Sequence, residues 1–410
     1  MEPVPPLRRP EFRRLLLISI TVALGFGMLI PILPLYASSF GVGLAAIGLV
    51  QTVFGLTRFS FGLVGGLVVD RFGERASTIA GLLIVSASSY AAGFAETFPQ
   101  LVAARGFGGV GSALFIAGLM NRILRIIEPE AMSRATGSFR SSFLVGIAAG
   151  PALGGLLSKS FGLTAPFFFY ATGLLVASVI AWFVMAGEAL ERKPRRSPLE
   201  ALRAAKPFML DFRYVLALAA TFAGWWIISG PAQNLGPVFA TTRLGFSSEQ
   251  VGYATTMLAA GELLVLLVSG RAADTYGRRA VLLPSMAVSA VATVALGQIE
   301  GAPWLYFPIM AALGAGIAAS SVAAGGLLAD SVPKGGSGAA VGVNQMAGDL
   351  GYLIAPTAIG SLAQATSFST AYIAAAVPAV AVFVAAAKAP AGTGTRVAVE
   401  LPWEPHEHTH

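Results

Sequence analysis

Cysteine is absent from this 410-residue chain, histidine occurs only three times, and charged residues are scarce. Without cysteine the chain can form neither a disulfide nor a thiol-ligated metal site. The three histidines lie within the last five residues and make a poor metal site, so we expect no metal and no cofactor. Only 11% of the residues are charged, 55% are hydrophobic, and the mean hydropathy is +0.74. This composition excludes a soluble domain of this size and indicates a polytopic membrane protein.

Signatures of enzyme sites are also missing. The sequence contains no nucleotide-binding loop, no HExxH motif and no nucleophile elbow, so we do not expect an enzyme. The net charge of +7 would suit a nucleic-acid partner, but the basic residues are distributed as a membrane topology requires. We therefore expect no nucleic acid among the partners.

Apolar runs of bilayer length recur along the whole chain. A transmembrane helix needs about 20 residues, and the sequence predicts an all-α protein with twelve such helices. They fall at residues 15–36, 44–69, 76–95, 98–120, 135–157, 165–186, 214–239, 249–270, 280–299, 303–328, 338–363 and 369–388. Twenty-two of the 27 Lys and Arg residues lie in segments on one side of these spans. The positive-inside rule then predicts a bacterial inner-membrane protein with both termini in the cytoplasm.

One long connection, rich in charge and proline, divides the spans six and six. The predicted organisation is a tail at 1–14, a six-helix bundle at 15–186, a cytoplasmic linker at 187–213, a second bundle at 214–388 and a cytoplasmic tail at 389–410. Within the linker, Ser197 and Glu200 have the spacing of a capping box, which predicts a short surface helix through Lys206.

The segment from Gly137 to Gly155 is apolar and rich in glycine. Gly146, Gly150 and Gly154 are four residues apart, so on a helix they form one smooth stripe where a second helix can approach closely. Pro151 removes one helical hydrogen bond and bends the axis. We expect this stripe to pack against the eighth span.

The two halves of the chain repeat at a fixed offset. The second span ends in a loop motif that contains Gly66, Asp70, Arg71, Gly73 and Arg75. All of these except Arg71 recur 204 residues later, in a copy that contains Gly270, Asp274, Gly277, Arg278 and Arg279. The glycine-rich segment also recurs, 205 residues on. We expect the charges of each loop to contact the facing half and to part when that side opens. Glu74 stands where the second copy has Arg278, which weakens the first copy.

These patterns together resemble the major facilitator superfamily, and within it the twelve-span drug:proton antiporters, which include multidrug pumps and vesicular amine transporters. The glycine pattern of 137–155 is similar to the fifth-helix antiporter motif, and Pro31 and Pro34 are typical of the branch. The segment 105–111 resembles a fourth-helix motif whose arginine, here Arg105, is implicated in proton coupling. The resemblance implies two pseudo-symmetric six-helix bundles that alternate access to a substrate between them. Val22, Ala318 and Asn344 stand where the amine transporters carry carboxylates, so recognition of a cation is not carried over.

Away from the ends of the predicted spans, the membrane interior holds five charged side chains: Arg58, Arg105, Arg140, Glu262 and Asp349. A charge in hydrocarbon is expensive, so each is a functional candidate. In the fold that the resemblance implies, the second span faces the eleventh and the fifth faces the eighth. Together with the similar depths this predicts two ion pairs across the interface between halves, Arg58 with Asp349 and Arg140 with Glu262. The first pair is the candidate for proton coupling and the second for a gate. Arg105 has no predicted partner, so one positive charge remains unbalanced inside the spans, which favours a neutral or anionic substrate.

Polar and aromatic residues of the spans are candidates for a substrate cavity: Tyr36, Gln51, Trp225, Trp226, Gln233, Asn234, Asn344, Gln345 and Tyr352. The most economical interpretation is a monomeric proton-coupled exporter of small amphiphilic molecules or drugs, with protons and membrane lipid as its other partners. An importer or facilitator of a small polar or anionic metabolite is the alternative within transport. A membrane sensor of the same fold is a third interpretation, but it would not require buried charges.

Overall fold

The computed structural model describes residues 6–128, 131–185, 206–332 and 337–388, and this part of the chain folds into helices without strands. The first half consists of α1 (Pro10–Ser38), α2 (Leu44–Phe72), α3 (Glu74–Gly93), α4 (Phe98–Ile126), α5 (Met132–Phe161) and α6 (Ala165–Val184). The second half consists of α8 (Phe212–Ile227), η4 (Ile228–Leu235), α9 (Gly236–Thr242), α10 (Ser248–Tyr276), α11 (Arg278–Leu296), α12 (Tyr306–Ser331), α13 (Ser337–Ala365), α14 (Phe368–Ala375) and α15 (Val377–Lys388). Three short 3₁₀ segments, η1 (Pro6–Arg8), η3 (Lys206–Leu210) and η5 (Pro303–Leu305), precede α1, α8 and α12.

The described helices agree with the predicted all-α membrane fold. Ten helical segments are long and apolar enough to cross a membrane, and α10, bent by 44°, makes eleven. The remaining predicted span corresponds to α13, whose hydropathy is lowered by Asn344, Gln345 and Asp349. The seventh span is one continuous path built from α8, the π-helical segment η4 around Pro231, and α9. The expected surface helix after Ser197 lies outside the described residues, apart from its last residue, Lys206.

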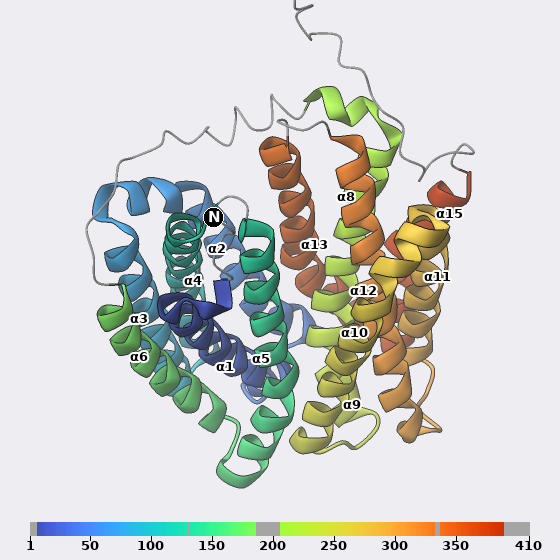
Figure 1. Ribbon diagram of the computed structural model, residues 1–410. Helices are drawn as coiled ribbons and strands as arrows, with labels where there is room; N and C mark the ends of the chain where they lie inside the picture. The colour runs from blue at the N-terminus through green and yellow to red at the C-terminus, as the bar shows by residue number, and fades with distance from the viewer. Residues whose placement is uncertain (1–5, 129–130, 186–205, 333–336, 389–410) are drawn as a thin grey trace, which may run out of the picture.

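The two halves stand side by side in Figure 1, and the described chain ends, η1 and α15, lie at the same end of the bundle. We call this the terminal end, and the opposite end, which carries Lys159 and Arg243, the far end. The halves meet where α2 packs on α13 and α5 packs on α10. The predicted facing of the second and eleventh spans, and of the fifth and eighth, is therefore confirmed.

The glycine stripe of α5 packs against α1, so the expected partner, the eighth span, was wrong. A Cβ atom at Gly146 would lie 2.7 Å from the Cβ of Ala23, and one at Gly150 would lie 2.5 Å from the carbonyl oxygen of Leu24. α1 contributes its own small residue, Gly27, to the same contact. Spacing of four residues makes a smooth face but does not choose the helix that uses it.

Other glycines bring the two halves together at the far end. A Cβ at Gly155 of α5 would lie 2.7 Å from the carbonyl oxygen of Ser248 on α10, and one at Gly252 would lie 2.5 Å from that of Pro151. The same contact recurs between α2 and α13, where a Cβ at Gly48 would collide with the backbone of Pro356. Backbone therefore touches backbone across the interface at both pseudo-equivalent places.

Along α2 the facing half recedes steadily towards the terminal end. At Gly48 there is no room for a Cβ; at Gly55 it would lie 3.5 Å from the Tyr352 ring; at Gly62 nothing lies within 4 Å. Gly270 and Gly342, on the terminal parts of α10 and α13, are likewise free of neighbours. The structure is thus closed between the halves at the far end and parted at the terminal end.

This geometry predicts opposite effects for one substitution at two glycines. Gly154→Ala places a methyl group against the backbone of Met28, and such overpacking destabilises by about 1–3 kcal/mol. Gly62→Ala meets no neighbour and raises helix propensity by about 1 kcal/mol. Thermal unfolding of the purified protein in detergent should show a lower melting temperature for the first variant and an unchanged or higher one for the second. Equal melting temperatures would contradict the close α1–α5 contact.

Candidate substrate site

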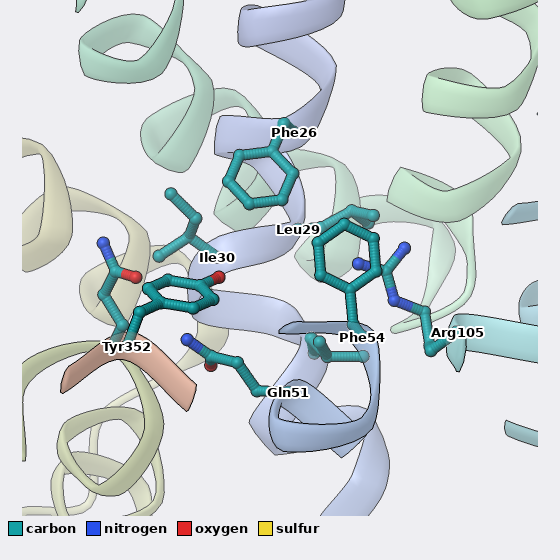
Figure 2. Close-up of a pocket in the computed structure, with 9 residues that line it drawn as sticks. Phe26, Leu29, Ile30, Gln51, Phe54, Arg105 and Tyr352 are labelled. Carbon is teal, nitrogen blue, oxygen red and sulfur yellow. The ribbon is translucent and has the colours of Figure 1, made fainter. Parts of the chain in front are cut away.

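A small cavity lies between the halves, near the middle of the spans. Its lining comes from both halves: Phe26, Leu29, Ile30, Leu33, Gln51, Phe54 and Arg105 from the first, Gln233 and Tyr352 from the second. Its volume of about 20 Å³ holds one water molecule. Apolar rings and aliphatic side chains form most of the wall, and four polar groups converge on it (Figure 2). This is the usual composition of a small-molecule site.

Arg105 is the charged member of this wall. It projects from α4, is only 2% exposed, and has its guanidinium 4.7 Å from the centre of the Phe54 ring. Its Nε and Nη1 atoms are buried and have no hydrogen-bond partner in the described part of the chain. Figure 2 shows the guanidinium beside Phe54 at the edge of the cavity. A buried cation with unsatisfied donors is costly in a fold, so it is a strong candidate for a functional group.

Asp349 and Arg58 lie on facing helices, as predicted, but they do not form the predicted ion pair in this conformation. The two groups are within electrostatic reach of each other, yet no ion pair shorter than 4 Å joins them among the described residues. The carboxylate of Asp349 accepts a hydrogen bond of 3.2 Å from Nε2 of Gln345, one turn earlier on α13. The pair is apart because the halves diverge at this level of the interface.

Four predicted cavity residues lie elsewhere and have other partners. The hydroxyl of Tyr36 donates a hydrogen bond of 3.0 Å to the carbonyl of Ala95 within the first half. The remaining three bind or pack on their own half: Asn234 donates to the carbonyl of Pro356, Asn344 accepts from Thr221 at 2.9 Å, and Trp226 packs on Phe222. The contacts of Tyr36, Asn234 and Asn344 lie within one half, and Trp226 and Phe222 share α8. Nε1 of Trp226 and Oδ1 of Asn234 are buried without a hydrogen-bond partner among the described residues.

The other candidates surround the cavity. Gln51, Gln233 and Tyr352 line it directly. Trp225 packs edge-to-face on Tyr352, with ring centres 5.9 Å apart, and Gln345 donates a hydrogen bond to Asp349. The apolar members, such as Phe26 and Phe54, were missed by sequence reasoning because phenylalanine in a membrane helix carries no signal that separates a cavity from lipid.

The second predicted pair lies on facing helices. Glu262 belongs to α10, which packs against α5, the helix that carries Arg140. The side chain of Arg140 and the surroundings of Gly66 and Gly137 are outside the described part of the structure. The pairing of Arg140 with Glu262 therefore stays a prediction.

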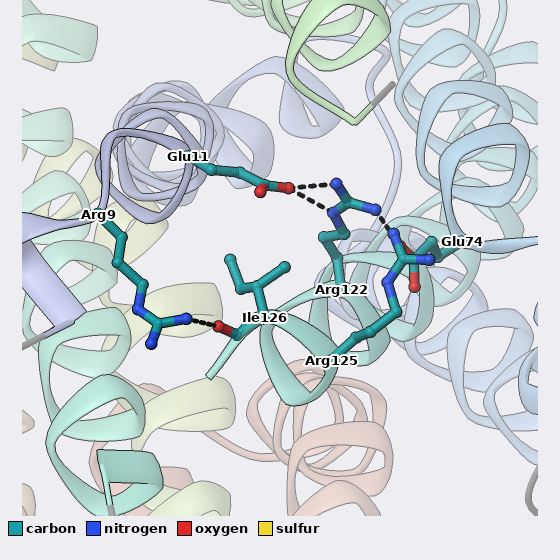
Figure 3. Close-up of polar contacts among 6 residues, drawn as sticks. All are labelled: Arg9, Glu11, Glu74, Arg122, Arg125 and Ile126. Atoms are coloured by element: carbon teal, nitrogen blue, oxygen red, sulfur yellow. Dashed lines mark hydrogen bonds and ion pairs between the residues drawn. The ribbon is translucent and has the colours of Figure 1, made fainter. Parts of the chain in front are cut away.

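The loops at the terminal end carry ion pairs of opposite polarity in the two halves. In the first half Glu74 binds Arg122, at 2.7 Å, and Arg125, both at the end of α4 (Figure 3). In the second half Arg278 takes the place of Glu74 and binds Asp330, at 3.5 Å, at the end of α12. Glu74 therefore does not weaken the first copy, because its α4 partners are basic where the α12 partner is acidic.

A second pair of loop contacts is repeated without change of sign. Arg75 donates a hydrogen bond of 2.8 Å to the carbonyl of Trp182, and Arg279 donates one of 2.6 Å to the carbonyl of Ala387. Both arginines and both acceptors are related by the repeat. The ion pairs described for these loops stay within one half, and a contact with the facing half is not among them.

At the far end the halves are joined by polar contacts that the sequence did not indicate. Lys159 of α5 forms an ion pair with Glu249 of α10, and Tyr253 donates to the same carboxylate at 2.8 Å. At the pseudo-equivalent place the backbone N–H of Ala45 donates to Oε1 of Gln364 at 3.1 Å. One contact is ionic and the other neutral.

The family follows from this architecture together with comparison to known proteins. A family model described as Major Facilitator Superfamily matches residues 15–247 and again 215–401, and the two overlapping matches together cover most of the chain. The chain belongs to this superfamily. It is therefore a membrane transporter and not an enzyme.

Relatives of known name agree with the superfamily. Multidrug resistance protein 1 of Bacillus subtilis is 24% identical over 234 residues, which is 57% of this chain and only 59% of that protein. The class C tetracycline resistance protein of Escherichia coli is 28% identical over 308 residues, which cover 72% of this chain and 75% of that protein. The crystal structure of the nucleoside transporter NupG shares the fold with a TM-score of 0.76 at 14% identity, covering 93% of this chain and all of that one. The superfamily is thus clear, while these relatives differ in what they carry.

The ion pairs of the terminal end can be tested by removing one carboxylate. Glu74→Gln removes the carboxylate shared by Arg122, whose side chain is 6% exposed, and Arg125, while Arg122 keeps its ion pair with Glu11. Loss of a partner to a buried charged group destabilises by about 1–3 kcal/mol. Asp274→Asn is the matched control, because its side chain is 72% exposed and an exposed pair contributes about 0–1 kcal/mol. Melting temperatures in detergent should fall clearly for the first variant only; an equal fall in both would refute the difference in burial.

The far-end ion pair predicts a charge-reversal effect on closure. Lys159→Glu places two carboxylates together at Glu249 and should open the far end, and the swap Lys159→Glu with Glu249→Lys should close it again. A cysteine at Ala152, whose N–H donates to Thr256 across the interface, is then the only thiol in the chain. Its reaction rate with a maleimide in detergent should rise several-fold in the single variant and return in the swap. Arg243→Glu, which faces Glu300 within one half, should leave the rate unchanged.

Proposed function

We propose that this transporter is a proton-coupled exporter of small amphiphilic molecules that works by alternating access. The observation that carries the proposal is the separated pair of Asp349 and Arg58. The two opposite charges lie on α13 and α2, the helices that join the halves, near the middle of the spans. Because they belong to different halves, the distance between them changes as the halves rock.

A carboxylate that meets a guanidinium in one conformation and not in the other can bind a proton in turn. The nearby positive charge stabilises the ionised carboxylate, and its withdrawal inside an apolar bundle favours the protonated form. The basic residues of the terminal end support a cytoplasmic position for it, so the conformation described here would open to the cytoplasm. The antiporter motif of α5 and the drug-resistance relatives support export.

Arg105 favours a second candidate, a proton-coupled importer or facilitator of an anionic metabolite. Its unsatisfied donors in the cavity wall would suit an anion. The two candidates differ in the direction of proton flow relative to the substrate. An antiporter moves protons against the substrate flux, an importer moves them with it, and a facilitator moves none.

The coupling role of Asp349 is tested in proteoliposomes with a panel of amphiphilic compounds that begins with tetracycline. Asp349→Asn should reduce transport driven by a pH jump at least tenfold, since the amide cannot carry the proton. Glu262→Gln should retain coupling, and Glu96→Gln, an exposed carboxylate in a loop of the far end, serves as the control. A pH-sensitive dye reports the proton flux.

Two outcomes would contradict this assignment. Full proton-driven transport in Asp349→Asn would remove that residue from the mechanism, and loss in Glu262→Gln alone would transfer the role to Glu262. Substrate movement by the native chain without any proton flux would favour the facilitator.

A further inference from the structure

Two opposite charges face the middle of the bundle from different halves, and neither has an ion-pair partner. Arg105 of α4 lines the cavity with unsatisfied Nε and Nη1 atoms. Asp349 of α13 has a hydrogen bond from Gln345 and no ion pair within the described part of the chain. Arg105 is buried and Asp349 half-buried, and neither has a counter-charge in contact. This arrangement is costly unless a ligand provides the missing counter-charges.

Tyr352 connects the cavity with Asp349. It lines the cavity together with Arg105. Asp349 is three residues earlier on the same face of α13 and does not itself line the cavity. A ligand that extends from the cavity past Tyr352 along α13 can therefore reach from the guanidinium of Arg105 to the carboxylate of Asp349.

Arg105 and Asp349 bind different chemical groups of a ligand. A guanidinium offers planar, paired N–H donors that match a carboxylate or another oxyanion. A carboxylate only accepts hydrogen bonds and is matched by an ammonium or a proton. The cavity wall beside Arg105 is apolar and aromatic, with Phe26, Leu29, Ile30 and Phe54 facing the space.

The depths of the two residues give the length of the ligand. Arg105 is seven residues from the far end of α4, about 10 Å, and Asp349 is sixteen residues from the far end of α13, about 24 Å. The two backbone positions therefore differ in depth by about 13 Å along the bundle, so a ligand that contacts both charges must be of roughly this length. The cavity must widen for such a ligand, as the stacked rings of Phe26 and Phe54 separate.

We propose that the substrate is a zwitterionic amphiphile, with an anionic group bound by Arg105, an ammonium directed at Asp349 and an aromatic or apolar body between them. This inference rests on the proposed transport function and specifies its substrate class. It also gives the coupling its direction, because the ammonium and a proton compete for the same carboxylate. Competition of this kind drives exchange in opposite directions.

The test uses four ligands with one biphenyl body and different ends. They are 4′-(aminomethyl)biphenyl-4-carboxylate, its carboxamide, 4′-methylbiphenyl-4-carboxylate and the corresponding uncharged carboxamide. Titration calorimetry of the purified full chain in detergent should give a Kd for the zwitterion at least tenfold below that of the other three. Arg105→Gln should weaken the zwitterion to the level of the cation, and Asp349→Asn should weaken it to the level of the anion.

Controls separate this effect from a change in net charge. Arg14→Gln and Glu96→Gln remove one exposed charge of each sign, outside the cavity, and should keep the preference. Arg105→Lys keeps the positive charge but lacks the paired N–H donors, so it should retain part of the preference for the zwitterion. Equal binding of the zwitterion and the uncharged compound, no binding by any of the four, or a preference that survives Arg105→Gln would each overturn the proposal.

The outcome is independent of the coupling experiment. If the zwitterion preference is absent but Asp349→Asn still abolishes proton-driven transport, the proposed function stands and the substrate class is wrong. If the preference is present but transport moves no protons, the substrate class stands and the proposed coupling is wrong.

Discussion

The close approach of backbones at the far end is the contact on which the rest of this structure depends. Lipid is as apolar as leucine, so helices in a bilayer gain little by burying apolar side chains against each other and associate through close packing. Gly48 and Gly252, with Gly155 on α5, allow the halves to touch backbone to backbone there. With that end fixed, the halves diverge towards the terminal end, and the cavity lies where they begin to part.

The repeat preserves contacts more faithfully than residues. Glu74 binds Arg125 in the first half and Arg278 binds Asp330 in the second, so the ion pair survives with its charges exchanged. Such an exchange keeps the attraction between the two groups, because the Coulomb energy depends only on the product of the charges. Reading each motif copy by itself hid this, since the compensating residue lies some 50 positions further along the chain.

Sequence reasoning predicted the helices, the facing pairs and several site residues, and it failed where the answer depends on conformation or on a partner helix. Depth along a span located Arg58 and Asp349 because helical rise is constant. The ion pair between them is not formed in this conformation, and whether it forms in the other arrangement stays a prediction, since one sequence must serve both. Gly150 was recognised as a packing residue, but nothing in its spacing identified Leu24 of α1 as the neighbour.

Placing the opposite charges on different halves makes ligand affinity depend on conformation. Arg105 moves with the first half and Asp349 with the second, so a rigid ligand that contacts both fits only the arrangement in which their separation matches its length. A ligand shifts an equilibrium only by its difference in affinity for the two conformations. Two charges on one half would stay at a fixed distance and would hold substrate equally well in either arrangement. Separation across the interface therefore links binding to the rocking of the halves.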